Sequence, residues 1–302
     1  MNEGYVSIGR TRQLLQGFSH NEIQVSEGYI SKLQKRLYNS LLEFDNELKK
    51  EIIRKRIIHW DDTVVMVATS RACLRFYGDS ETAYYTAHMH KNKEGLDEDG
   101  ILLALDKETV VVHDHNVVNY NDDYEFQNAE CCAHLLRDLK KVVDNLKREW
   151  AVNMANLLIE GNIKRNQGEY IDAEYLSLCY DTIVAQGDLE NNGDSEPYYA
   201  DTEATLLERL KKYKENYLLW TLNAEIPFTN NEAERGLRSS KTKMKVSGQF
   251  SNLEHAKYFA TIKGYLEAGH RHNMNSVELI RRALDGNPVS LEEMKKHDEE
   301  EF

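Results

Sequence analysis

The sequence predicts an α/β fold: a mixed sheet with the element order β-β-β-α-β, an all-helical insertion, and helical flanks at both ends. Three observations support this. Residues 57–113 hold β-branched, extended segments around one helical stretch. Residues 130–222 carry apolar side chains at helical spacing. Acidic residues stand on both sides of this block, which predicts a sheet protein whose site is completed after the insertion.

The elements follow in order along the chain. Helices are expected at 6–16 and from Ser26 through Leu48. Strands are expected at 57–67, 72–77, 82–88 and 109–113, with a helix at 93–105 before the last one. Helices at 133–150, 152–163, 170–185 and 202–220 fill the insertion, with a polar loop at 187–199.

Changes of pattern divide the chain into five predicted regions. Residues 1–56 are helical and resemble a helix-turn-helix in outline, although a plain helical hairpin is the simpler interpretation. Residues 57–129 form the first part of the sheet core, and residues 130–226 form the helical insertion. Residues 227–285 complete the core, and residues 286–302 form an acidic tail.

Composition limits the class of protein. The 302 residues are 41% hydrophobic, which suffices for a sizeable core. No apolar run of about 18 residues and no signal-peptide pattern occurs, so we expect a cytoplasmic protein that does not enter a membrane. Four cysteines without a CxxC pair predict reduced thiols. The net charge of −13 argues against a protein that coats nucleic acid, but a local cationic site remains open.

Three acidic residues form the candidate catalytic site. Asp61 lies in the first strand, Asp114 ends the fourth, and Glu234 lies in a helix after Pro227. Converging carboxylates repel one another unless a cation lies between them, and hard oxygen ligands favour Mg²⁺ or Mn²⁺. Two such ions, about 3.5–4 Å apart, support phosphodiester chemistry. Asp62 competes with Asp61, but strand alternation places the two on opposite faces, so only one is a ligand.

The alternatives for these acids are less specific. Asp114 could be an ordinary acid at a strand-to-loop turn, and Glu234 could form a solvated ion pair with Arg238. Flanking histidines also suggest a His/Asp metallohydrolase that uses zinc, manganese or iron, although no HExxH-type spacing occurs. These histidines, interpreted instead as neighbours of the ligands or solvent groups, are His59, His113 and His115.

A basic block directly follows the third acid. Asn230, Glu234 and Arg238 fall at i, i+4 and i+8 and share one helix face. These basic side chains could form a local cationic site, with a solvated helix face as the alternative. The block consists of Arg235, Arg238, Lys241, Lys243 and Lys245.

Cys131 and His134 stand three residues apart where a strand meets a helix. They could form half of a metal site, but no second pair supports zinc, so we expect a structural or site-shaping role.

Four ordered motifs resemble transposases of the insertion sequence 66 family. They are HWDDT at 59–63, VHD at 112–114, CCAHLLRDL at 131–139 and NNEAER at 230–235. The segments SGQF at 247–250 and AKYFATIKGY at 256–265 are also similar to that family. The resemblance covers about residues 4–285, and the order of the motifs makes it more specific than any one alone.

The resemblance implies a DDE transposase core of ribonuclease H-like fold. Asp61, Asp114 and Glu234 match the metal-binding triad for two Mg²⁺ or Mn²⁺ ions. The expected reaction is cleavage of a DNA strand at the end of an insertion sequence and its transfer to target DNA. The expected partners are DNA, further copies of the chain in a homo-oligomer on DNA, and accessory proteins of the same element. The basic block beyond Glu234 is then expected to contact DNA phosphates. It comprises Arg235, Arg238, Lys241, Lys243 and Lys245.

Other matched positions are expected to shape the site. Cys131 and His134 match a C(2)H motif between the second and third acids, and Asn230 and Asn231 open the third motif. Asp62 stands where the family usually has glutamate. The family's additional N-terminal region is not found in this sequence, and the acidic charge is unusual. The alternative is therefore a catalytically incomplete or truncated remnant that acts only as a DNA-binding or regulatory protein.

Overall fold

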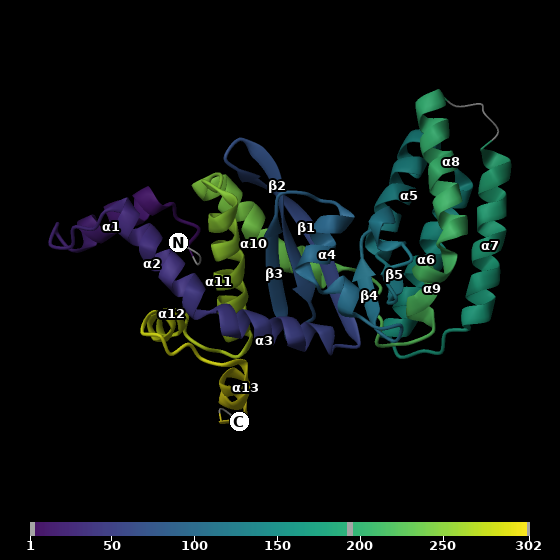
Figure 1. Cartoon of the computed structure of the whole chain (residues 1–302). Helices are drawn as coiled ribbons and strands as arrows, with labels where there is room; N and C mark the ends of the chain where they lie inside the picture. Colours follow the sequence, from purple (N-terminus) through teal and green to yellow (C-terminus); the bar gives the residue numbers. More distant parts are fainter. Residues whose placement is uncertain (1–3, 192–195, 301–302) are drawn as a thin grey trace. The chain divides into compact units, whose positions relative to one another are not determined.

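The computed structural model describes residues 4–191 and 196–300 (Figure 1). These residues form two compact units. The first contains the residues up to Thr109, residues 121–126 and the residues from Asn231 onward. The second contains residues 110–120 and 127–230. Antiparallel strand pairs occur in the first unit and a parallel pair in the second, so the predicted mixed α/β class is confirmed.

The first unit is built on three antiparallel strands, β1 (Ile57–Val67), β2 (Ser70–Gly78) and β3 (Ala83–His88). They coincide with the three extended segments that the β-branched pattern predicts. Asp61 pairs with Phe76, and Asp62 pairs with Arg75. Because directly opposed residues share a face, Asp61 and Phe76 lie on one face of the sheet and Asp62 and Arg75 on the other.

Two helices, α10 (Asn231–Ser247) and α11 (Leu253–Arg271), pack on the Phe76 face. Strand residues such as Val65 form one core cluster with Leu237 of α10 and Phe259 of α11. Gly236 permits the close approach of α10, because a Cβ there would lie 2.6 Å from the Phe76 ring. The Tyr85 hydroxyl donates to the Gly236 carbonyl at 3.1 Å. The third acidic motif therefore begins a helix that is seated on the sheet.

The opposite face of the sheet carries a buried ion pair. The Arg75 guanidinium is fully buried and donates to Asp99 Oδ2 at 2.8 Å, and the Tyr77 hydroxyl donates to the same oxygen. Asp99 ends α4 (Lys93–Asp99). The predicted helix 93–105 is too long: Gly100 adopts the left-handed conformation, with φ of 62°, and ends the helix there. A separate 3₁₀ turn, Leu102–Ala104, follows.

Further helices complete the first unit. The helix predicted from Ser26 through Leu48 is in fact two helices, which meet at Leu41. The acidic C-terminal region contains a helix in which Met294 is buried. The helices are α1 (Ile8–Phe18), α2 (Glu27–Ser40), α3 (Leu42–Ile53), α12 (Ser276–Leu284) and α13 (Leu291–Glu300).

The second unit joins a short parallel strand pair to helices. Its strands are β4 (Val110–His113) and β5 (Gln127–Glu130). The sequence places a strand end before Cys131 but gives no bounds for β5, because its four residues are mostly polar. Between β5 and Asn231, helices α5 to α9 are found among the described residues. These helices are α5 (Cys132–Leu146), α6 (Glu149–Asn166), α7 (Ala173–Glu190), α8 (Pro197–Lys212) and α9 (Lys214–Leu218).

Trp150 is a core residue of the helices of the second unit. It is fully buried, and its Nε1–H donates to Glu203 Oε1 at 2.7 Å. The polar loop predicted at 187–199 is shorter than expected, because α7 continues to Glu190 and α8 begins at Pro197; residues 192–195 of that loop lie outside the described residues. Throughout 4–191 and 196–300, no helix is long and apolar enough to cross a membrane.

Candidate active site

The second acid belongs to a compact group of three potential metal ligands. The parallel register pairs His113 with Glu130, so the residues that follow them, Asp114 and Cys131, leave the same edge of the strand pair. Cys131 precedes α5, and His134 lies in its first turn. One ligand atom from each of Asp114, Cys131 and His134 lies within 4.8 Å of the others. The strand ends thus bring the second and third sequence motifs together.

His134 is held from both sides of its ring. Its Nδ1 lies 2.8 Å from Asp114 Oδ1, and its Nε2 lies 2.8 Å from Arg137 Nη1. The hydrogen bond to Asp114, and then the one to Cys131, raise the pKa of His134 to about 10. Arg137 opposes this rise, because a guanidinium only donates and needs a lone pair on Nε2. The contact with Asp114 suits both the neutral and the protonated His134 ring, since Nδ1 can carry a proton in each form.

Cys131 links the motif at α5 to the residues just before α10. Its thiol is buried, and its sulfur accepts the Asn230 backbone N–H at 3.2 Å, although 99 residues separate the two in sequence. The next residue repeats the pattern, since the Cys132 N–H donates to the Phe228 carbonyl at 3.1 Å. Asn230 is fully buried, whereas Asn231 is exposed and begins α10. Cys131 and Cys132 therefore connect the start of the third motif to the backbone just before α10.

The donor types test which metal this group suits. Carboxylate, thiol and imidazole together fit a softer transition metal such as Zn²⁺, whereas Mg²⁺ takes oxygen ligands. The predicted Mg²⁺ or Mn²⁺ set of Asp61, Asp114 and Glu234 consists of oxygen donors alone. Asp61 and Glu234 belong to the first unit and Asp114 to the second. The triad as a whole therefore stays a prediction.

Within the first unit, Asp61 and Asp62 have different surroundings. Asp62 Oδ1 forms an ion pair with Lys91 Nζ at 2.6 Å, and its side chain is only 3% exposed. Asp61 lies on the opposite face, where α10 packs, and its Oδ1 accepts the Asp62 backbone N–H at 2.7 Å. Glu234 is half-buried on α10. Asp61 is thus the acid whose strand face meets the helix that carries Glu234.

The basic block divides into an exposed face and one buried lysine. Arg235, Arg238, Lys241 and Lys245 are exposed on α10. Lys243 is only 9% exposed; its Nζ donates to the Gly248 carbonyl at 2.9 Å and lies 3.5 Å from the centroid of the Phe250 ring. Burial lowers the pKa of Lys243 to about 8. Lys243 therefore differs from the other four residues predicted to contact phosphate.

The histidines of the alternative metallohydrolase do not join the metal-ligand group found among the described residues. His113 is buried, with Nδ1 at 2.8 Å from the Asp114 carbonyl and Nε2 at 2.8 Å from Asn128 Oδ1. His115 Nδ1 lies 2.7 Å from Glu130 Oε1. His59 is buried in the first unit. These positions favour histidines that neighbour the acids over a His-rich metal site.

Two residues of this region were not predicted as site residues. Arg137 contacts His134, and Glu130 accepts hydrogen bonds from Tyr120 and His115. The contact of Arg137 with His134 could have been predicted, because residues three apart in a helix lie on the same face. Glu130 has no such signal, because its contacts depend on the pairing of β5 with β4, which the sequence does not predict.

The motifs, their order and the helical insertion agree with a comparison to protein families. The sequence matches the model of the family described as "Transposase IS66 family" over residues 6–258. No curated protein matches the chain. The resemblance found in the sequence motifs is confirmed, because the match spans most of the 302 residues. The chain belongs to the IS66 family of transposases.

Proposed function

We propose that this protein is a DDE-type transposase with a ribonuclease H-like core, and that it cleaves and transfers DNA strands in a metal-dependent reaction. One observation carries the proposal: Asp61 lies on the face of β1 against which α10 packs, and α10 carries Glu234. A carboxylate on a core strand and a second one on the helix seated against that face are what an oxygen-ligated ion would need.

The metal would be held by Asp61, Asp114 and Glu234. When bound, two Mg²⁺ or Mn²⁺ ions would activate the attacking oxygen and stabilise the leaving oxygen. The residues of the chain supply position and charge around this chemistry. His134 would orient the Asp114 carboxylate through its 2.8 Å contact. The exposed arginines and lysines of α10 would bind phosphates and set the position of the DNA backbone.

The reaction has two displacement steps. In cleavage, a water oxygen forms a bond to phosphorus and the 3′ oxygen of the element end leaves. In transfer, that 3′ oxygen forms a bond to a target phosphorus and a target 3′ oxygen leaves. Each step exchanges one phosphorus–oxygen bond for another, so no redox partner is needed. We propose that a homo-oligomer on DNA, with accessory proteins of the same element, brings the two DNA substrates together.

The test is Mn²⁺-dependent nicking of a duplex that carries the element end, with wild type and Glu234→Gln compared. This change keeps the shape of the side chain and removes its charge. Nicking should fall by at least roughly 100-fold, since changes to mere neighbours of metal ligands already cost 10–100-fold. Glu232→Gln is the matched control. Glu232 lies on the same helix, but it is paired with Arg235 and is not assigned to the metal.

The outcomes separate the two candidate functions. Nicking that requires Mn²⁺ and Glu234, and that survives in Glu232→Gln, supports the enzyme. A folded wild type that binds DNA without nicking it would instead support the truncated remnant that only binds DNA.

A further inference from the structure

The group formed by Asp114, Cys131 and His134 has a second possible use, because its donors are those of a zinc site. One ligand atom from each residue lies within 4.8 Å of the others, and all three residues belong to the second unit. Thiolate, imidazole and carboxylate are the usual protein ligands of Zn²⁺. Three such ligands leave a fourth position open for water, as in catalytic zinc sites.

Backbone hydrogen bonds hold the three ligands in place. The Cys131 N–H donates to the His113 carbonyl at 2.9 Å, which fixes the cysteine beside the strand end that carries Asp114. The His134 N–H donates to the Cys131 carbonyl at 3.2 Å in the first turn of α5. The Asn230 N–H reaches the Cys131 sulfur at 3.2 Å. Hydrogen bonds of this kind orient a metal ligand and support the charge of a bound thiolate.

A zinc ion would take the place of a shared proton. His134 Nδ1 lies 2.8 Å from Asp114 Oδ1, and both side chains are 30% exposed, whereas Cys131 is 1% exposed. A metal can therefore reach the group from the side of the imidazole and the carboxylate. Zn²⁺ binds neutral imidazole and deprotonated sulfur, so the ring then carries its one proton on Nε2 and the thiol passes its proton to water.

Arg137 opposes metal binding at Nδ1. Its Nη1 lies 2.8 Å from His134 Nε2, a contact that needs a lone pair on Nε2. A ring that binds zinc through Nδ1 has a proton there instead. Arg137 is exposed on α5, so its side chain must turn away when zinc binds. Histidine ligands of zinc usually donate this second N–H to an oxygen acceptor, so an acceptor at position 137 should strengthen binding.

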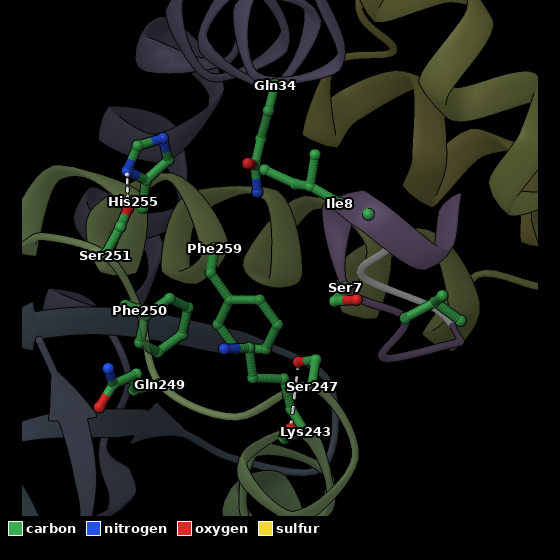
Figure 2. A pocket seen from close by; sticks show the side chains of 12 residues that line it. Ser7, Ile8, Gln34, Lys243, Ser247, Gln249, Phe250, Ser251, His255 and Phe259 are labelled. Carbon is green, nitrogen blue, oxygen red and sulfur yellow. Dashed lines mark hydrogen bonds between the residues drawn. The ribbon is translucent and has the colours of Figure 1, made fainter. Parts of the chain in front are cut away.

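His255 of the first unit illustrates a histidine without these donors. Figure 2 shows its ring turned toward Ser251, whose Oγ lies 2.8 Å from Nδ1. Asn252 Oδ1 lies 2.9 Å from the same nitrogen, and Ser31 Oγ lies 3.1 Å from Nε2. Hydroxyls and amides are not among the usual zinc ligands. His255 is therefore a matched control for His134.

Zinc in this group would compete with the proposed catalytic ions. Sites with nitrogen and sulfur donors bind Zn²⁺ more tightly than Mn²⁺, and Mg²⁺ prefers oxygen donors. Asp114 is the member of the predicted triad that belongs to the second unit. A carboxylate that neutralises part of the zinc charge attracts a second divalent cation less strongly, and the zinc ion itself repels that cation.

We propose that Asp114, Cys131 and His134 form a zinc site that competes with the catalytic metal for Asp114. The inference rests on the proposed transposition function and adds inhibition by Zn²⁺ to it. Zinc is bound through Asp114 Oδ1, the Cys131 sulfur and His134 Nδ1, with water in the fourth position. Arg137 weakens this binding and so makes the inhibition reversible.

The first test measures binding without any reaction. Co²⁺ is the probe, because a bond between Co²⁺ and a thiolate gives an intense charge-transfer absorption, which Zn²⁺ removes when it displaces the cobalt. The full-length wild type should show this absorption. Cys131→Ser should abolish it, and Cys179→Ser, outside the group, should keep it. His134→Asn should weaken Zn²⁺ binding by at least about 100-fold, and His255→Asn should leave it unchanged.

Arg137→Gln should change the affinity in the opposite direction. The glutamine carbonyl oxygen can accept the Nε2–H of a zinc-bound ring, so Zn²⁺ should bind about tenfold more tightly. Lys140→Gln, exposed on the same helix, removes an equal charge and is the matched control. A gain of affinity cannot result from misfolding. Equal affinities of these two variants would overturn binding through Nδ1.

The second test measures the competition. Electron paramagnetic resonance of free Mn²⁺ reports how much Mn²⁺ the protein holds. One equivalent of Zn²⁺ should release Mn²⁺ from the wild type and from Cys179→Ser, and should inhibit their Mn²⁺-dependent nicking of the element-end duplex. Cys131→Ser should resist both effects of Zn²⁺. Circular dichroism verifies that each variant is folded.

The outcomes separate this inference from the proposed function. A folded wild type without the thiolate absorption, or an absorption that survives in Cys131→Ser, overturns the zinc site. Zinc that binds through Cys131 without releasing Mn²⁺ overturns the competition. A wild type that exchanges Mn²⁺ for Zn²⁺ through Cys131 but never nicks DNA would refute the proposed catalysis and leave the competition for Asp114 standing.

Discussion

The Nδ1 atom of His134 lies 2.8 Å from Oδ1 of Asp114, so the second acid of the predicted triad is paired with a histidine from the following motif. Both side chains are about one-third exposed, which leaves the pair open to solvent on one side. A contact of this kind positions a carboxylate and also makes its surroundings sensitive to pH.

The contribution of His134 to stability should depend on pH. Its pKa rises from 6.5 to about 10 in the folded protein, so its ion pair is fully present below about pH 6.5 and is lost as the pH rises toward 10. His134→Asn should lower the free energy of unfolding by about 1–2 kcal/mol at pH 6 and by much less at pH 10. Urea denaturation across this range measures the difference, with the exposed His20→Asn as control. A loss that does not change with pH would contradict the ion pair.

The Asp114, Cys131 and His134 group should distinguish zinc from magnesium. Its thiol and imidazole donors favour Zn²⁺, so Zn²⁺ should raise the melting temperature of the wild type through Cys131, whereas any rise that Mg²⁺ causes should not depend on Cys131. At 100 times the dissociation constant the gain is about 2.7 kcal/mol. Differential scanning fluorimetry of wild type and Cys131→Ser checks this. An equal zinc effect in both proteins would place the bound metal elsewhere.

The seating of α10 should depend on Gly236. A Cβ at this position would lie 2.6 Å from the Phe76 ring, so Gly236→Ala should destabilise the fold by about 1–3 kcal/mol. Gly264→Ala in α11 is the matched control, because its nearest neighbour would lie 3.5 Å away and the helix favours alanine. Chemical denaturation compares the two. Equal stability of both variants would mean that α10 is not packed closely on β2.

The buried lysine should lower stability at neutral pH. Since burial lowers the pKa of Lys243 from 10.5 to about 8, the unfolded chain holds one more proton between these pH values, and stability rises with pH across that window. Lys243→Met should stabilise the protein by about 1–3 kcal/mol at pH 7, and the gain should shrink by pH 10.5. The exposed Lys241→Met should stay within about 0.5 kcal/mol of the wild type. Denaturation at pH 7 and pH 10.5 tests both.

The exposed face of α10 should account for part of the salt dependence of DNA binding. Arg238→Gln should weaken binding to any duplex and reduce the slope of log affinity against log salt by about 1. Lys140→Gln, at an exposed position of α5, removes one charge as well and serves as the control. Fluorescence anisotropy at several salt concentrations gives the slope. A change that depends on the DNA sequence would instead indicate a base contact.

Local pattern predicted much of this protein because local pattern decides which element forms. The alternation and β-branching of residues 57–67 set β1, and apolar side chains at helical spacing set the helices of the insertion. The order of short motifs was enough to indicate the IS66 family. Some helix ends were predicted wrongly because one residue overrides the spacing pattern. Gly100, for example, ends α4 although the apolar spacing continues beyond it.

Only the tertiary structure decided the surroundings of each side chain, because burial depends on neighbours that are distant in sequence. It placed Asp61 on the face covered by α10 and paired Asp62 with Lys91. It separated Lys243 from the other basic residues of its helix through contacts with Gly248 and Phe250. It also joined Cys131 to a backbone amide 99 residues away, a contact for which neither periodicity nor spacing contains a signal.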